Sequence, residues 1–376
     1  MIRRLLLALL LVAGPAFGVG EPSHQNGTVT ITAAAASATD TLTAVVLADT
    51  LMLYSFEGAG DSTPDCDMIS GEITDTTTLT FERTGTTGCS AINVQWWTME
   101  WATGVTVQRG SFNCVSAGNP ADTTITAVTL AQSWPVVSVR RDGSNLNRDD
   151  FFTAHLTTTT NLQTEFFSAA SGTCVLKWQV VDYTSASVQT TELTWSLSDT
   201  TKDWTMSSAL LDDTIMSFSH RVGGTGQRFP DRLLFRNWQV NSTTVRTDRS
   251  NSGSIAAATR HQAVTLPASE VSVQTIDFAF GTGDATKDVE ITAVTQAESI
   301  IVASGMQGYG WGKTAYSADD NLMKGIATFA FVDADTVRAT RGVTGDAADY
   351  KALVIDFDQG GAPPARSRGS VIGARQ

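Results

Sequence analysis

Three aromatic residues separated by glycines have the types and spacing of a ligand site. Tyr309, Trp311 and Tyr316 lie in the segment 305–320. Rings between flexible glycines can stack on sugar faces, and polar neighbours can bond to hydroxyl groups. The sequence predicts a site with an exposed Trp311 at its centre, formed by Gln307, Tyr309, Trp311, Lys313 and Tyr316. The alternative is that these rings pack on a neighbouring unit or on a second copy.

Catalytic chemistry has little support in the sequence. The chain has four histidines, and none lies in a His-Glu-x-x-His arrangement that would bind zinc. A Gly-x-Ser-x-Gly nucleophile turn and the glycine patterns of phosphate-binding loops are also missing from the sequence. His155 lies in an expected strand and has no partner that would make it a base. The sequence therefore predicts a protein without enzymatic activity or cofactor.

Acidic residues recur at the ends of loops: Asp65, Asp150, Asp231 and Asp320. Such a recurrence suggests calcium, which needs six or more oxygen ligands. The sequence has no EF-hand loop and no calcium-binding nonapeptide repeat. Capping of turns by aspartate is the favoured interpretation, so no metal site is predicted.

Short patterns recur along the chain in the same order. The first starts with an apolar residue and ends on Ser or Thr eight residues later: Leu42–Thr50, Ile125–Ser133, Met206–Thr214 and Ile291–Ser299. The second comprises Thr78–Arg83, Asn161–Phe166, Thr244–Arg249 and Thr336–Arg341. The third comprises Val105–Gln108, Ala186–Gln189 and Val271–Gln274. Patterns in a fixed order at a period of about 80 residues indicate a tandem array of four units.

Each unit consists of about six short strands joined by turns that contain Gly or Asp. In the second unit the expected strands are Val105–Phe112, Thr123–Leu130, Pro135–Arg141, Phe151–Leu156, Leu162–Phe167 and Val175–Tyr183. The predicted fold is all-β, with antiparallel β-sandwich units at 19–103, 104–184, 185–268 and 269–359. The loop after the third strand differs most between units and is longest in the fourth, so binding is expected there.

A family resemblance follows from this layout. A strand of the type Val-x-x-Ser, a polar loop with Asp, a Thr-rich turn and the closing strand Lys177–Tyr183 follow one another. This order resembles the small sandwich repeats of H-type lectins and of many bacterial and phage surface proteins, over residues 27–358. The third unit departs from it, with His261 where the second has Trp178. The resemblance implies the fold and a binding role, and carries over no sugar-binding residue.

The ends of the chain indicate export. Two arginines and an apolar run of about ten residues form a signal peptide, expected at residues 1–18 with cleavage after Gly18. Four cysteines in an exported chain suggest disulfides, expected within single units as Cys66–Cys89 and Cys114–Cys174. No membrane-spanning segment is expected after cleavage. Residues 360–376 are expected to form a disordered basic tail.

Charge narrows the class of partner. Lys and Arg total 25 against 38 Asp and Glu, which gives a formal net charge of −13 and argues against nucleic-acid binding. The sequence predicts an exported surface or structural protein that mediates attachment, with glycans or surface proteins as partners. Two alternatives stay open: a lectin-like carbohydrate-binding protein, and a virion or tail-fibre component. Formation of a homo-oligomer is also left open.

Overall fold

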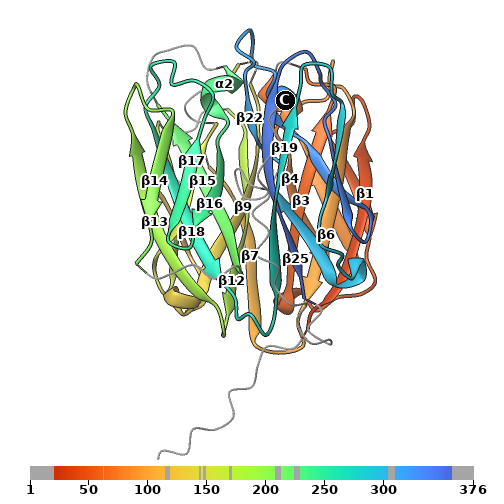
Figure 1. The fold of residues 1–376 in the computed structure, drawn as a ribbon, viewed down its shortest axis with the longest axis vertical. Helices are drawn as coiled ribbons and strands as arrows, with labels where there is room; N and C mark the ends of the chain where they lie inside the picture. Colours follow the sequence, from red (N-terminus) through yellow and green to blue (C-terminus); the bar gives the residue numbers. More distant parts are fainter. Residues whose placement is uncertain are drawn as a thin grey trace, which may run out of the picture.

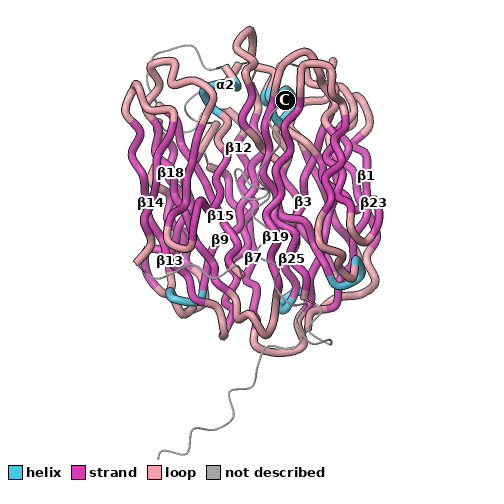
Figure 2. Tube along the Cα trace, viewed as in Figure 1, coloured by secondary structure: helices cyan, strands magenta, loops and turns pink. Residues whose placement is uncertain are grey.

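The computed structural model describes residues 21–357, apart from 62, 115–118, 144, 147–149, 169–171, 208–212, 224–228 and 304–309. Nearly all of its regular structure is antiparallel strand, running lengthwise around the molecule (Figures 1 and 2). The all-β fold predicted from the sequence is therefore confirmed. The expected signal peptide and basic tail lie outside the described residues.

One order of strands recurs along the chain, and we call each recurrence a repeat (R1 to R4). R1 comprises β1 (Ser23–Ile31), β2 (Ser37–Thr41), β3 (Thr50–Gly58), β4 (Ser70–Asp75), β5 (Thr78–Glu82) and β6 (Ile92–Glu100). R2 comprises β7 (Val105–Asn113), β8 (Ala121–Thr124), β9 (Ser133–Arg141), β10 (Phe152–Thr158), β11 (Asn161–Phe166) and β12 (Cys174–Tyr183). R3 comprises β13 (Ser187–Trp195), β14 (Thr201–Thr205), β15 (Thr214–Val222), β16 (Arg236–Asn241), β17 (Thr244–Asp248) and β18 (Ala257–Thr265). R4 comprises β19 (Ser272–Phe280), β20 (Thr286–Glu290), β21 (Ser299–Ala303), β22 (Lys313–Thr314), β23 (Thr328–Asp333), β24 (Thr336–Thr340) and β25 (Ala348–Asp356).

In each repeat the first, last and third strands pair in one sheet, and the second strand pairs with the hairpin before the last strand in another. In R1 the two sheets have the orders β1-β6-β3 and β2-β5-β4, and R4 has β19-β25-β21 and β20-β24-β23. In R2 and R3 the same orders occur, and a β10–β15 pairing joins one sheet of each. The predicted limits of the units fall in connections between these sets of strands. Whether each set is a separate domain stays a prediction.

Helices in the described part of the chain are single turns. They are α1 (Pro64–Asp67), α2 (Pro230–Leu233), and the 3-10 turns η1 (Leu47–Asp49), η2 (Leu130–Gln132), η3 (Gln296–Glu298) and η5 (Leu322–Gly325). One expected strand of R2, Thr123–Leu130, is wrong in its second half, because the chain leaves the sheet after Thr124. The backbone N–H groups of Ile125 and Val128 instead donate to carbonyls of the β10–β11 turn. Their burial there gave the apolar pattern of a strand.

The recurring patterns of the sequence are hydrogen-bonding devices. A glutamine of each first strand bonds to the backbone of a residue 18 positions later: Gln25 with Thr43, Gln108 with Thr126, Gln189 with Ser207 and Gln274 with Thr292. The hydroxyl that begins a third strand donates to the carbonyl four residues earlier in Thr50, Ser133 and Ser299. These bonds hold the loops that lead into the third strands, so the patterns recur for structural reasons.

Three repeats also end the second pattern with a buried arginine. Arg83 donates to the carbonyls of Thr32, Ala35 and Ser90, and Arg341 to those of Gly281, Asp284 and Asp346. Arg249 donates to four carbonyls in the same way. Burial lowers the pKa of Arg249 to about 10, and the carbonyls replace the water that it loses. R2 has Phe166 at this position.

The repeats close into a ring, because each fourth strand packs on the next repeat's sheet. β4 contacts β9 and β12, β10 contacts β15 and β18, β16 contacts β25, and β23 contacts β3 and β6. A serine of the third strand marks three of these junctions. Its Oγ accepts the backbone N–H of Gly71 (Ser138, 3.3 Å), Ala154 (Ser219, 2.9 Å) or Phe329 (Ser55, 3.3 Å). The equivalent serine of R4, Ser304, lies outside the described residues.

The hydrophobic core does not follow the repeats. At one end of the ring, the second residues of all four third strands, Leu51, Trp134, Ile215 and Ile300, line one small cavity of about 40 Å³. At the other end the loops after the third strands meet, where α2 and β22 are seen at the top of Figure 1. There the Leu146 N–H donates to Asp320 (2.9 Å) and the Asp231 N–H to the Tyr316 carbonyl (3.0 Å). Both ends of the core are therefore shared between repeats.

Loss of a buried arginine should destabilise the fold. In Arg341→Gln three backbone carbonyls lose the donor that the buried guanidinium provides, which should lower the free energy of unfolding by about 3 kcal/mol or more. Arg338→Gln is the control, because Arg338 and its partner Asp288 are more than 40% exposed. It should leave the free energy of unfolding nearly unchanged. Chemical denaturation of both variants tests this, and equal losses would contradict it.

The buried carboxyl of Asp67 should make stability depend on pH. Burial, and then the charge of Asp61, raise the pKa of Asp67 to about 8, and its side chain is 1% exposed. A folded pKa above the unfolded value means that the folded state holds the proton more tightly. The contribution is fully present below about pH 4 and is lost as pH rises towards 8.

Asp67→Asn should therefore remove a fall in stability between pH 4 and pH 8. Denaturation midpoints across this range measure it. Asp75→Asn is the control, since hydrogen bonds from Thr77 lower the pKa of exposed Asp75 and confine its effect to more acidic pH. An unchanged slope in Asp67→Asn would show that Asp67 is ionised in the folded protein.

Candidate functional site

The aromatic loop predicted as a ligand site is largely occupied by internal packing. Gln307 and Tyr309 lie outside the described residues. Trp311 is 2% exposed, so the exposed position expected for it is wrong. Its ring lies 5.7 Å from that of Phe151 of R2 and 5.9 Å from that of His220 of R3. These partners come from other repeats, which is why the local sequence did not reveal them.

The other two predicted residues also contact the protein. Lys313 Nζ lies 3.0 Å from Asp248 of R3 and 3.7 Å from Asp349. Tyr316 is half-buried, and Lys324 Nζ lies 4.8 Å from the centre of its ring. Burial and a hydrogen bond with Asp319 raise the pKa of Tyr316. The described part of this loop thus joins R4 to its neighbours, and a binding role for it stays a prediction.

The histidines lie in surroundings that keep them neutral. His220 is fully buried and stacks on Phe151 at 5.1 Å, and burial lowers its pKa to about 3. His261 is also fully buried, with its pKa lowered to about 3 for the same reason. His155 is partly buried in β10, where burial lowers its pKa to about 4. His220 and His261 are therefore part of the packed interior, and His155 lies partly buried where R2 meets R3.

The cysteines and loop acids serve the structure. The two disulfides are Cys66–Cys89 and Cys114–Cys174, as predicted. Among the loop acids, Asp150 pairs with buried Arg141 at 3.0 Å, and Asp231 accepts a bond from Asn251. Asp61 is near the sulfurs of Cys66 and Cys89, but these are bonded to each other and offer no thiolate.

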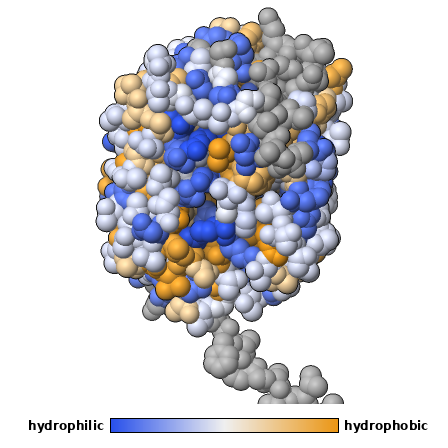
Figure 3. All heavy atoms as spheres, turned by 180° about the vertical axis from the view of Figure 1, so that it is seen from behind, coloured by the Kyte–Doolittle hydropathy of each residue, from blue (hydrophilic) through white to orange (hydrophobic). Residues whose placement is uncertain are grey.

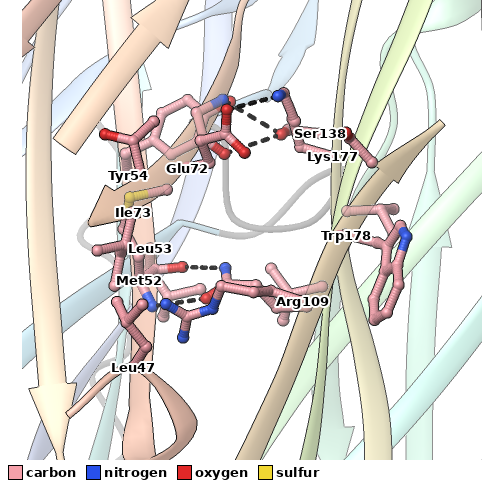
Figure 4. Close-up of a pocket in the computed structure, with 17 residues that line it drawn as sticks. Leu47, Met52, Leu53, Tyr54, Glu72, Ile73, Arg109, Ser138, Lys177 and Trp178 are labelled. Carbon is pink, nitrogen blue, oxygen red and sulfur yellow. Dashed lines mark hydrogen bonds and ion pairs between the residues drawn. The ribbon is translucent and has the colours of Figure 1, made fainter. Parts of the chain in front are cut away.

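A cavity of about 340 Å³ lies between R1 and R2 (Figure 4). One wall is formed by the edges of the two R1 sheets, from Met52–Tyr54 on β3 and Gly71–Thr74 on β4. The opposite wall is the outer face of the R2 sheet β7-β12-β9. Its volume is at the lower end for ligand pockets and suits a molecule of about one or two sugar units.

Charged and amide groups cross this cavity from one repeat to the other. Lys177 Nζ lies 2.5 Å from Glu72 Oε1. The Gln179 side chain accepts the Met52 N–H at 3.0 Å and donates to the Met52 carbonyl at 2.8 Å. Figure 4 shows the Lys177–Glu72 pair and Arg109 on opposite sides of the open space. Apolar side chains, including Leu47 and Ile73, complete the lining.

The equivalent space between R3 and R4 is filled. By strand register, Trp238 of R3 stands where R1 has Glu72, and Lys351 of R4 stands where R2 has Lys177. Lys351 Nζ lies 5.0 Å from the centre of the Trp238 ring, and the remaining cavity is about 10 Å³. The large cavity thus arises from a local difference between otherwise similar repeats.

The other two junctions carry different residues at matching positions, and at the Glu72 position R4 has the smaller Ala330. His155 of R2 takes the place of Glu72 at the R2–R3 junction, and Trp97 of R1 takes the place of Gln179 at the R4–R1 junction. The sequence interpretation missed Glu72, Arg109 and Lys177. A position-by-position comparison of the repeats contains part of the signal, because Arg109 is the one charged residue at its position, whereas the residue at the Glu72 position differs in every repeat.

The surface on the far side from Figure 1 mixes hydrophilic and hydrophobic residues, and its visible apolar patches are scattered (Figure 3). No helix in the described part of the chain is long and apolar enough to cross a membrane. No protein-family model and no curated protein matches the chain. The resemblance to H-type lectin repeats therefore stays a prediction.

Removal of the Trp311 ring should destabilise the protein. Trp311→Ala leaves a cavity among Phe151, His220 and the neighbouring core, and such truncations cost about 3–5 kcal/mol. Differential scanning calorimetry should show a large fall in Tm. Lys313→Ala, in the same loop but half-buried, should lower Tm much less. If the Tm of Trp311→Ala is close to that of the unmodified protein, the result would contradict burial of the ring and support the exposed position predicted from the sequence.

Proposed function

We propose that this chain is an exported, non-enzymatic attachment protein that binds a carbohydrate-sized ligand in the R1–R2 cavity. The observation that carries the proposal is this cavity itself. It has a charged pair, the Gln179 amide and apolar walls within one space, whereas the matching R3–R4 space is closed by Trp238. A junction that needed only to hold two repeats together would be closed in the same way.

The compartment supports an attachment role. The predicted signal peptide would direct the chain out of the cytoplasm. Disulfides such as Cys66–Cys89 form and persist in the oxidising environment outside it. A ring held by shared cores and disulfides presents a fixed surface outside the cell. Rigid presentation lowers the entropy cost of binding a ligand.

The chemistry of the cavity supports binding and gives no support to catalysis. Lys177 and Glu72 form an ion pair across the space, so each charge is compensated by the other. The histidines pack elsewhere in the fold. Polar groups that cross an otherwise apolar space fix the orientation of a ligand, and this is the usual arrangement of a binding pocket.

Glycans are the ligand class that fits this role best. A sugar unit offers hydroxyls to Glu72 and Lys177 and an apolar ring face to side chains such as Leu47 and Ile73. Multiple weak contacts of this kind suit attachment to a surface that carries many copies of one glycan. The lectin-like interpretation of the sequence thus has its best structural support in this cavity.

Filling the cavity tests the proposal with a design taken from the chain itself. Glu72→Trp reproduces the R3–R4 arrangement, with Lys177 over the new ring as Lys351 lies over Trp238. The variant should keep its Tm and lose about ten-fold or more in binding on an array of immobilised glycans. Glu290→Trp, an equal change at an exposed site in R4, is the control for nonspecific binding by a new tryptophan.

Three outcomes of the glycan-array experiment distinguish between the possibilities for the binding site. Binding by the unmodified protein and by Glu290→Trp, with loss in Glu72→Trp, supports the proposal. Equal binding by all three proteins would place the site elsewhere. No glycan bound by the unmodified protein would overturn carbohydrate attachment as its function.

A further inference from the structure

Arg109 differs from the other arginines that are held within the fold. Arg341 donates to three backbone carbonyls, and Arg141 pairs with Asp150 at 3.0 Å. Arg109 donates only to the Thr50 carbonyl, through Nη2. Its Nε and Nη1 are buried and have no hydrogen-bond partner among the described residues. Arg109 is thus a guanidinium whose loss of water is poorly compensated by the protein.

The charges around Arg109 leave it without a carboxylate partner. Glu72 is the acid that acts on it, and that carboxylate lies 2.5 Å from Lys177. Burial lowers the pKa of Arg109 to about 10, which still leaves the group charged at neutral pH. A partly desolvated cation without a partner is costly, and an anion bound beside it lowers that cost.

The position of Arg109 connects this charge to the cavity. Arg109 lies on β7 opposite Gln179 of β12 and lines the R1–R2 cavity. By register, the matching residues of the other repeats are the uncharged Asn26, Thr190 and Thr275. The other three repeats fold without a charge at this position. The one charged residue among the four, Arg109, lies beside the large cavity.

We propose that the R1–R2 cavity binds an organic carboxylate and that Arg109 is the residue that recognises it. This inference rests on the proposed function and specifies its ligand. Nη2 carries two hydrogens, of which one serves Thr50, so the guanidinium can donate to a carboxylate at the cavity wall. The Lys177–Glu72 pair faces the hydroxyls of the ligand, and Ile73 and Leu47 face its apolar part.

The carboxylate that Arg109 recognises can belong to an acidic sugar of a glycan or to a free small carboxylic acid. Isothermal titration with sodium glucuronate, methyl glucoside and cyclohexanecarboxylate separates them. Glucuronate bound more tightly than the other two supports an acidic sugar. Glucuronate and cyclohexanecarboxylate bound equally supports a free acid. Preference for methyl glucoside would overturn the carboxylate while leaving the cavity as a sugar site.

Variants test the role of Arg109 itself. Arg109→Gln should weaken carboxylate binding about ten- to a hundred-fold, the range for one hydrogen bond to a charged group. It should leave binding of methyl glucoside unchanged. Arg338→Gln, an exposed arginine of R4, should leave both unchanged. Carboxylate binding that Arg109→Gln does not weaken would overturn the inference.

Stability provides a second readout that separates recognition from a structural role. Since Arg109 has little compensation in the fold, Arg109→Gln should keep or raise the Tm. A fall as large as that expected for Arg341→Gln would show that Arg109 holds the junction together, and would overturn the inference. If Glu72→Trp abolishes ligand binding and Arg109→Gln leaves it unchanged, the proposed function is retained. The inference that the ligand is a carboxylate recognised by Arg109 is then rejected.

Discussion

The fold depends on one repeated contact, in which the fourth strand of each repeat packs on the next repeat's sheet. An edge strand that carries unpaired N–H groups invites pairing with other chains. Here the hydroxyls of Ser55, Ser138 and Ser219 each accept one such N–H, at three of the four junctions. The same contact, made in the same direction from R1 to R4 and back to R1, closes the ring and covers these edges with protein.

Closure of the ring explains why the described part of the fourth-repeat loop packs against other repeats. Loops at the tips of a linear array extend into solvent, and their variation between repeats suggests binding. In this ring the loops after the third strands converge, and their described parts must fit residues of neighbouring repeats. Their variation reflects this fit, as the contact of Trp311 with Phe151 and His220 illustrates. Sequence variation among repeats therefore records packing in the described parts of these loops.

The sequence was informative about interactions within a repeat and uninformative about those between repeats. Antiparallel strands, the recurring glutamine and arginine positions, and both disulfides depend on residues less than about 80 positions apart, and their patterns are visible in one repeat. Arg109 and Glu72 come from different repeats, and their shared cavity exists only once the ring is closed. No period or motif encodes such a contact. For the same reason the burial of Trp311 could not be derived from its glycine neighbours.

Divergence at equivalent positions then becomes the most useful signal in the chain. Where repeats share a structural need, they keep the same residue, as with Ser55, Ser138 and Ser219. Where they differ at a junction, the difference either fills space or creates it: Trp238 fills the R3–R4 junction, whereas Glu72 leaves the R1–R2 junction open. An open junction loses packing contacts and buries polar groups, and both cost stability. One tryptophan closes the equivalent space between R3 and R4, so the same substitution could close the R1–R2 cavity. The protein keeps this cavity at the expense of its own stability. Such a pattern is expected where a ligand occupies the space of the missing side chain.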